Sequence, residues 1–207
     1  MRNPLHRKVS SRGTKANGLP AFLCGANVSA VQISAGTRAS FAGFQLPPQS
    51  WSQLADVRPN LLIGFSSDFR RLLHSVPGAG ITLSSVDRAL VTLIQCGDSL
   101  LDEPLRRDLW AAFGVPVYEV FISPTGYPLA LECEAHEGWH VEPGLRATLS
   151  MQQMVFEAKT GERFQSGMTG VILADPCSCG RPSLRVVGTQ KQQRPASRNQ
   201  RLACAAA

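Results

Sequence analysis

The chain has 207 residues, enough for one large hydrophobic core or two small ones. Its apolar content of 43% is ordinary for a globular protein, and no run approaches the roughly 20 apolar residues that span a bilayer, so we expect no membrane partner. The net charge of +6 comes from the two ends, because residues 1–55 hold six Lys/Arg, residues 189–207 hold four, and neither segment holds an acid. The middle carries 11 basic and 15 acidic residues, which argues against a nucleic-acid-binding face.

Residues 1–45 form a basic segment with no firm periodic pattern. An Arg/Ser-rich, acid-free start is also typical of an organelle transit peptide. The weakly apolar stretch at 19–36 is a poor signal peptide, because it begins late and polar residues interrupt it. We therefore expect a cytoplasmic, reducing location in which cysteines stay free to bind metal, whereas a secreted chain would more often pair them as disulfides.

Between residues 46 and 94 the pattern predicts short helices alternating with buried strands. Helices are expected at 48–56 and 68–75, a short helix or turn at 84–89, and strands at 61–64 and 90–94. The second of these strands, Leu-Val-Thr-Leu-Ile, is a continuous apolar run typical of a strand covered on both faces.

The clearest helix is predicted over 103–113. Asp102 is a suitable N-cap, Pro104 fits the first turn, and Gly114 ends the helix. A strand at 115–121 follows. Alternation of strands and helices over 60–121 favours an α/β fold, with a mostly parallel sheet flanked by helices on both faces.

After residue 128 the pattern changes to short strands, at 128–133, 139–142, 147–157 and 169–174, with a turn at 159–162. The tail from Thr189 has no core-forming pattern and is expected to be disordered. We therefore divide the chain into a basic N-terminal segment (1–45), an α/β core (46–127), a smaller β-rich subdomain (128–188) and a basic tail (189–207).

Three cysteines and one histidine in the β-rich part form a possible metal site. Cys133 and His140 are separated by six residues, and Cys177 and Cys179 flank a single serine ahead of Gly180. Three thiolates and one imidazole complete a tetrahedral zinc set with no position left for water, so zinc here would be structural. Two alternatives stay open: His136 in place of His140, and buried free thiols with no metal.

The order of motifs over about residues 46–188 resembles the phenylacetate–coenzyme A ligase branch of the adenylate-forming enzymes. The matching segments are Arg58-Pro-Asn-Leu-Leu-Ile-Gly-Phe-Ser-Ser67, Cys96-Gly-Asp-Ser-Leu100, 105–118, Glu132-Cys-Glu-Ala-His-Glu-Gly-Trp-His-Val141, Thr160-Gly-Glu162, and Cys177-Ser-Cys-Gly-Arg181. Several ordered segments are more specific than any single motif.

The resemblance implies ATP- and Mg²⁺-dependent activation of a small carboxylic acid to an acyl-adenylate, followed by transfer to coenzyme A. It also implies that the Cys₃His set holds structural zinc. By the matching family positions, Gly97, Asp98, Phe121 and Thr125 would contact the nucleotide, although glycine, aspartate and threonine are also ordinary residues of turns after strands.

The chain departs from the family pattern at the groups that carry the chemistry. No glutamate follows Thr125, and the next acid is Glu132. The family's stretch with the ribose-binding aspartate is not found in this sequence, and Asp175 is a poor substitute for that aspartate. The family's C-terminal lid, which carries a catalytic lysine, is not found either. A Ser/Thr/Gly-rich stretch at 10–15 resembles the phosphate loop but is better explained as part of a basic tail.

Three hypotheses follow: a ligase-like domain with impaired activity in a truncated chain, a non-catalytic zinc-stabilised binding or assembly module derived from that fold, and an unrelated zinc protein. A partner chain or a second copy could supply the missing parts in the second case.

Overall fold

The computed structural model describes residues 19, 23, 27–34, 41, 44–79, 83–95 and 98–189. In chain order the elements are β1 (Ala30–Gln32), β2 (Phe44–Gln45), the 3₁₀ helix η2 (Pro48–Gln53), α1 (Leu54–Val57), β3 (Leu61–Phe65), α2 (Ser66–Ala79), β4 (Ala89–Gln95), α3 (Glu103–Phe113), β5 (Val117–Ile122), β6 (Pro128–Glu132), β7 (Trp139–Val141), β8 (Leu145–Ser150), β9 (Gln153–Ala158), β10 (Arg163–Leu173) and β11 (Arg185–Thr189).

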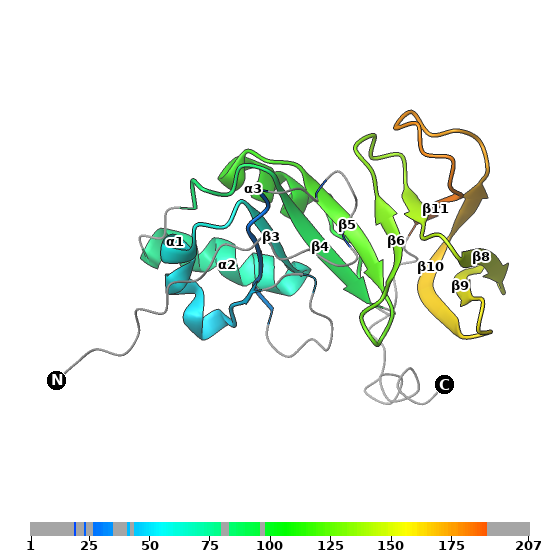
Figure 1. Cartoon of the computed structure of the whole chain (residues 1–207), viewed down its shortest axis with the longest axis horizontal. Coiled ribbons are helices and arrows are strands. Elements are labelled where there is room, and N and C mark those ends of the chain that lie inside the picture. The colour runs from blue at the N-terminus through cyan, green and yellow to red at the C-terminus, as the bar shows by residue number, and fades with distance from the viewer. Residues whose placement is uncertain are drawn as a thin grey trace.

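The strands of the described residues belong to one sheet, in the order β2-β1-β3-β4-β5-β6-β7-β11-β10-β9-β8. The strands from β2 to β5 are parallel, and every pairing from β5 to β8 is antiparallel. The whole sheet is therefore mixed. Over 60–121, where a mostly parallel sheet was expected, β3, β4 and β5 are parallel neighbours, which confirms that expectation. The change in direction falls between β5 and β6, where the sequence pattern also changes (Figure 1).

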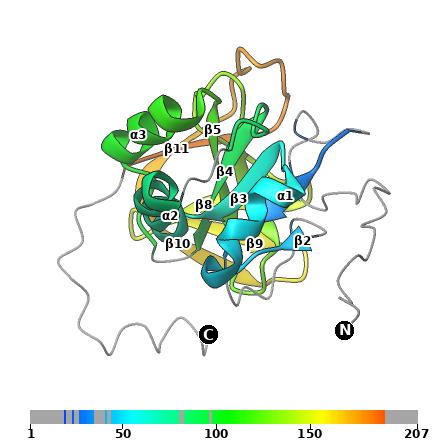
Figure 2. The ribbon, with the colours of Figure 1, turned by 90° about the vertical axis from the view of Figure 1, so that its left-hand side faces the viewer.

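The described helices all pack on one face of the parallel strands. Trp51 of η2, Phe69 of α2 and Leu105 of α3 share one core with apolar residues of β3, β4 and β5. Figure 2 shows α2 and α3 on the same side of β3 and β4. On the opposite face, where helices were also expected, the described residues contain no α-helix; Leu19, Leu23 and Phe41 pack there, and Leu23 has a 3₁₀ conformation.

Helix α3 begins and ends where the sequence predicts. The Asp102 carboxylate accepts a hydrogen bond from the main-chain N of Leu105 at 2.8 Å, which satisfies a free donor of the first turn. Gly114 ends the helix with φ of 66°, a left-handed conformation that favours glycine.

Replacing Asp102 by alanine removes this cap, and we expect it to lower the free energy of unfolding by about 1 kcal/mol. The ion pair of Asp102 with Arg70 adds little, because both side chains are about half exposed. Urea denaturation measures the change. Asp108→Ala, an exposed change inside the same helix, is the control and should not destabilise; equal losses in the two variants would contradict the cap.

Two elements of the antiparallel half differ from the sequence prediction. The expected single strand at 147–157 is a hairpin of β8 and β9, turned by Met151 and Gln152 with φ of 49° and 65°. Strand β11 was not expected, and it pairs with both β7 and β10. The turn at 159–162 is confirmed by a hydrogen bond from Ala158 N to Glu162 O at 2.8 Å.

Smaller differences concern boundaries. Helix α2 is longer than the expected 68–75, residues 84–89 hold a turn and the start of β4, and β10 begins at Arg163 where a strand was expected from 169. Among the described residues no helix has both the length and the apolar character needed to cross a membrane.

Candidate functional site

The four predicted metal ligands come from two loops that the sheet brings together. Cys133 is the first residue of the loop 133–138 between β6 and β7, here called the hairpin loop, and His140 lies in β7 just after it. Cys177 and Cys179 lie in the loop 174–184 between β10 and β11, here called the knuckle loop. Because β7 pairs with both β6 and β11, with Arg185 opposite His140, the two loops emerge side by side.

The four ligand atoms lie within 4.8 Å of one another. The Sγ atoms of Cys133 and Cys177 are 3.6 Å apart, and Cys179 Sγ is 3.3 Å from His140 Nε2. Around a tetrahedral zinc ion, bond lengths of about 2.3 Å to sulfur and about 2.0 Å to nitrogen separate two sulfurs by about 3.8 Å and sulfur from nitrogen by about 3.5 Å. The arrangement therefore fits one zinc ion, and 3.6 Å is too long for a disulfide bond.

His140 is oriented as a metal-binding histidine. Its Nδ1 lies 2.8 Å from the Ser183 hydroxyl, which leaves Nε2 facing the sulfurs. Burial, with the positive charges of Arg181 and Arg185, lowers the pKa of His140 and favours the neutral imidazole. A neutral imidazole with one fixed nitrogen is the form that coordinates zinc.

The knuckle loop turns tightly between its two cysteines and Gly180. Gly180 has φ of 79°, and its main-chain N donates to Cys177 O at 2.9 Å. Burial raises the pKa of the Cys177 thiol to about 11 without metal. Zinc must displace this proton to bind the thiolate, so metal affinity is expected to rise with pH.

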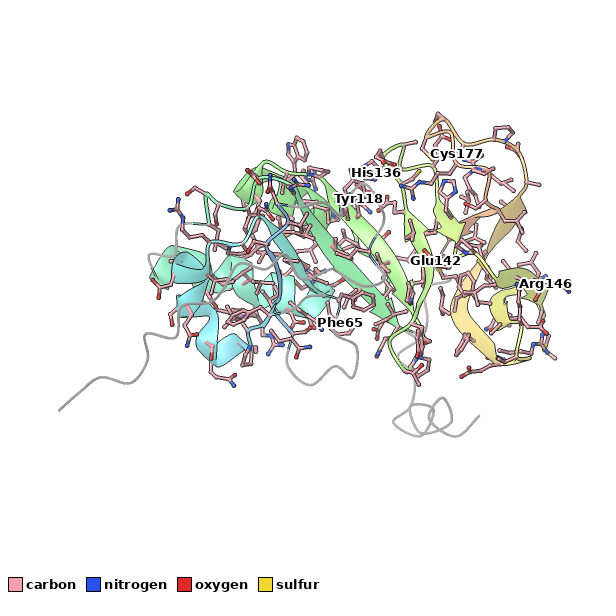
Figure 3. The ribbon with its side chains drawn as sticks, viewed as in Figure 1. Phe65, Tyr118, His136, Glu142, Arg146 and Cys177 are labelled. Atoms are coloured by element: carbon pink, nitrogen blue, oxygen red, sulfur yellow. The ribbon has the colours of Figure 1, made fainter. Side chains whose placement is uncertain are left out.

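His136, the alternative ligand, lies outside the cluster. Its Nδ1 is 2.7 Å from a Glu132 carboxylate oxygen, and its ring stacks on Tyr118 with centroids 5.2 Å apart. Figure 3 shows His136 beside Tyr118 and apart from Cys177. The structure therefore favours His140 over His136.

A buried ion cluster that the sequence did not reveal lies next to the hairpin loop. Glu119 and Glu132 are 3% and 6% exposed, and Arg106 Nη2 lies 3.3 Å from the first carboxylate and 3.2 Å from the second. Glu132 also accepts from Glu119 N at 2.9 Å, and Glu119 accepts from Leu101 N at 2.7 Å. Burial, together with the charge of Glu132, raises the pKa of Glu119 from 4.5 to about 7.

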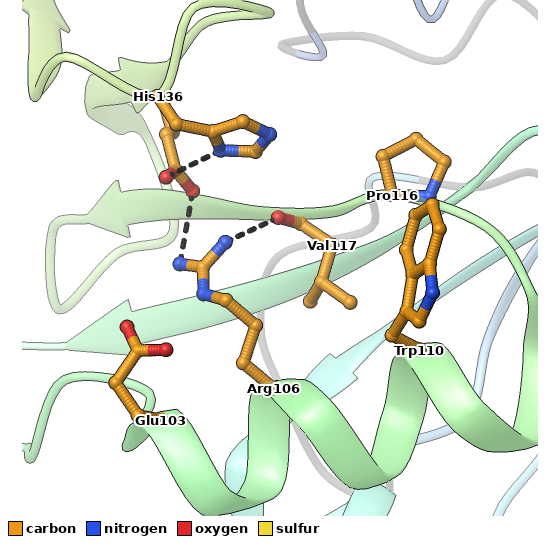
Figure 4. Close-up of a pocket in the computed structure, with 7 residues that line it drawn as sticks. Glu103, Arg106, Trp110, Pro116, Val117 and His136 are labelled. Atoms are coloured by element: carbon orange, nitrogen blue, oxygen red, sulfur yellow. Dashed lines mark hydrogen bonds and ion pairs between the residues drawn. The ribbon is translucent and has the colours of Figure 1, made fainter.

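A pocket of about 260 Å³ opens above this cluster, between α3 and the hairpin loop. Figure 4 shows Arg106 reaching from α3 toward the Val117 carbonyl, with Trp110 and Pro116 forming one wall and His136 another. The pocket includes none of the residues that the resemblance assigns to nucleotide binding.

Those residues lie at the carboxyl ends of β4 and β5. These strands are parallel neighbours with Gln95 opposite Ile122, so the turns that follow them share one edge of the sheet. Asp98 and Thr125 are both exposed there. Phe121 is 2% exposed and packs against Trp139 in the core. Gly97 lies outside the described residues.

Both exposed residues have local hydrogen-bond partners. The Asp98 carboxylate accepts from Gln95 N at 3.2 Å, and the Thr125 hydroxyl lies 2.9 Å from the Ser123 hydroxyl. Carboxyl ends of parallel strands are the usual place for ligands in open α/β sheets, so the edge suits a ligand. The hydrogen bonds of Asp98 and Thr125 are also typical of ordinary turns, so they do not by themselves indicate a ligand site.

No protein-family model matches this sequence, and no curated protein matches it. Solved structures do match. An open conformation of 2-hydroxyisobutyryl-CoA ligase in complex with 2-HIB-AMP and CoA has a TM-score of 0.59 at 14% identity, covering 76% of this chain and 43% of the ligase. Its postadenylation state gives 0.58 at 13% identity, covering 86% and 45%.

Coronafacic acid ligase from Pectobacterium brasiliense matches with a TM-score of 0.53 at 11% identity, covering 82% of this chain and 40% of that protein. At such identities these matches show that the chain shares its fold with part of these ligases, and they do not single out the phenylacetate–coenzyme A ligase branch. The chain spans less than half the length of each of these ligases.

Proposed function

We propose that this chain is an adenylate-forming, acyl- or aryl-CoA ligase-like domain of the phenylacetate–coenzyme A ligase type, with a structural zinc site. The observation that carries the proposal is the meeting of two independent features. The fold is shared with part of these CoA ligases, and the four residues of the motifs that resemble the family's zinc ligands meet in one group with dimensions that suit zinc. Zinc would clamp the hairpin and knuckle loops, with Cys133, His140, Cys177 and Cys179 as its ligands.

The proposed nucleotide site is the sheet edge after β4 and β5. Asp98 and Thr125 would contact the nucleotide, Gly97 would let it approach the main chain, and Phe121 would support the strand end from the core. ATP with Mg²⁺, a small carboxylic acid and coenzyme A are the ligands in this proposal, and a cytoplasmic location suits free thiols.

Catalysis is proposed to be impaired, and a specific contact supports this. The first acid after Thr125 is Glu132, which is buried against Arg106 and His136 and so is not free to hold Mg²⁺. Asp175 pairs with Arg185 at 3.3 Å and is a poor substitute for a ribose-binding aspartate. These contacts favour, as a second candidate, a non-catalytic zinc-stabilised binding module, in which a partner chain or second copy supplies the missing groups.

Nucleotide binding tests the proposed edge. We expect the zinc-loaded protein to bind ATP with Mg²⁺ in isothermal titration calorimetry, and Asp98→Ala to weaken binding at least tenfold. Asp87→Ala is the matched control, since it removes an exposed aspartate at the opposite end of the same strand. Absence of ATP binding by folded, zinc-loaded protein would remove the nucleotide proposal. Acid-dependent ATP–pyrophosphate exchange at an enzyme's rate, about 1 s⁻¹ or more, would remove the proposed impairment.

A further inference from the structure

The hairpin and knuckle loops are joined by charged side chains as well as by the four ligands. Glu137 of the hairpin loop reaches across to Ser178, which lies between the two knuckle cysteines. Its carboxylate accepts a hydrogen bond from the Ser178 hydroxyl and lies 3.4 Å from the Ser178 main-chain N. The same carboxylate is 3.5 Å from the Cys177 sulfur. One side chain thus holds the middle of the knuckle from the opposite loop.

A buried arginine fixes this carboxylate in turn. The Arg185 side chain is 6% exposed, and its Nη1 donates to Glu137 Oε2 at 3.0 Å and to Glu137 O at 3.1 Å. Its Nη2 donates to Asp175 Oδ2, in the knuckle loop, at 3.3 Å. Because Arg185 lies opposite His140 in the sheet, one buried cation ties both loops to the strand beside the histidine ligand.

From these contacts we propose that Glu137 is a positioning residue of the metal site, holding the knuckle loop in place so that Cys177 and Cys179 face Cys133 and His140 before metal binds. This inference rests on the proposed zinc site. Without Glu137, the metal would have to order two loops as it binds, and the entropy lost would lower its affinity. Residues that support metal ligands commonly change affinity 10- to 100-fold.

The negative charge of Glu137 acts against this effect, because a carboxylate near Cys177 disfavours the thiolate that zinc requires. Two features limit that cost: Arg185 neutralises the carboxylate at 3.0 Å, and Ser178 donates two hydrogen bonds to it. A bound zinc dication would also attract the Glu137 carboxylate. We therefore expect that in Glu137→Ala the loss of loop positioning outweighs the relief of repulsion. A higher zinc Kd would show that positioning dominates, and a lower Kd would show that repulsion dominates.

The test is zinc affinity, measured at 25 °C by competition with a chromogenic chelator. Glu137→Ala is expected to raise the zinc Kd by 10- to 100-fold, and Glu137→Gln, which keeps the shape, by less. The matched control is Glu134→Ala, since Glu134 joins the same two loops through Arg181 at 3.3 Å, but in an exposed pair. The control should change the Kd by less than about fivefold.

Cobalt spectra of each variant check that three thiolates and one histidine still bind. If Glu137→Ala does not fold, Asp175→Asn, which removes the other acid on Arg185, is expected to weaken zinc in the same direction. An unchanged or lower Kd in Glu137→Ala, with only the melting temperature reduced, would overturn the positioning role. Wild-type protein that binds no zinc would overturn the proposed metal site itself, which is a distinct result.

Discussion

Cys177→Ser is expected to lose the bound metal and to melt at a much lower temperature than the wild type. The four ligands join two loops that β7 and β11 hold only by short pairings, so the metal adds a cross-link that the sheet does not supply. A metal present at about 1,000 times its Kd stabilises the folded state by about 4 kcal/mol. For a domain of this size that corresponds to roughly 8–16 °C.

The measurement is elemental mass spectrometry on untagged protein purified without chelator, with thermal denaturation alongside. One zinc per wild-type chain is expected, with well under one in the variant. Chelator should lower the wild-type melting temperature and leave that of Cys177→Ser nearly unchanged. Cys204→Ser, a thiol outside the Cys₃His set, is the control and should retain zinc. A folded wild-type chain without zinc would contradict the clamp.

Local signals predicted the elements that depend on local chemistry. Helix α3 was predicted from its capping aspartate, its proline and the glycine after its last turn, because each acts on neighbouring main-chain groups. Strand β4 was predicted from a short, continuous apolar run, which is typical of a strand covered on both faces.

Elements that depend on distant partners were missed. The β8–β9 turn places Met151 and Gln152 at positive φ, where sequence reasoning looks for glycine or asparagine, so no turn signal divided the run. Strand β11 is short, and it is a strand because β7 and β10 flank it on both sides. The face of the parallel strands opposite α2 and α3 is covered by Leu19, Leu23 and Phe41, from an N-terminal segment without periodicity.

The metal ligands could be predicted because their residue types and spacing are rare, and the structure brings all four together. The ion cluster could not, because Arg106, Glu119 and Glu132 lie on three elements and meet only when β5 and β6 pair beneath α3. One signal was present: Glu119 interrupts the apolar strand Val117–Ile122, and a charge inside such a run needs a partner.

Glu119→Gln is expected to remove much of the loss of stability that the wild type shows as pH rises from 5 to 8. Burial and the charge of Glu132 raise the folded-state pKa of Glu119 from 4.5 to about 7, although Leu101 N and Arg106 oppose the shift. The contribution of this carboxyl is therefore fully present below pH 4.5 and is lost as pH rises through about 7. A shift of this size amounts to about 3 kcal/mol.

Urea denaturation of zinc-saturated protein gives the free energy of unfolding at pH 5 and pH 8 for the wild type and for Glu119→Gln. The change between the two pH values is then compared between the two proteins, so that groups that titrate alike in both cancel. The charged groups that act on Glu119 are Arg106 and Glu103 of α3 and Glu132 of β6. Glu162→Gln, an exposed change in the turn at 159–162, should leave the wild-type pH dependence intact.

An equal pH dependence of the free energy of unfolding in Glu119→Gln and wild type would mean that Arg106, 3.3 Å away, keeps Glu119 ionised despite its burial. The cluster would then be a buried ion pair with a second carboxylate. Arg106→Met would be the more damaging change, because it would remove the guanidinium that both buried carboxylates share.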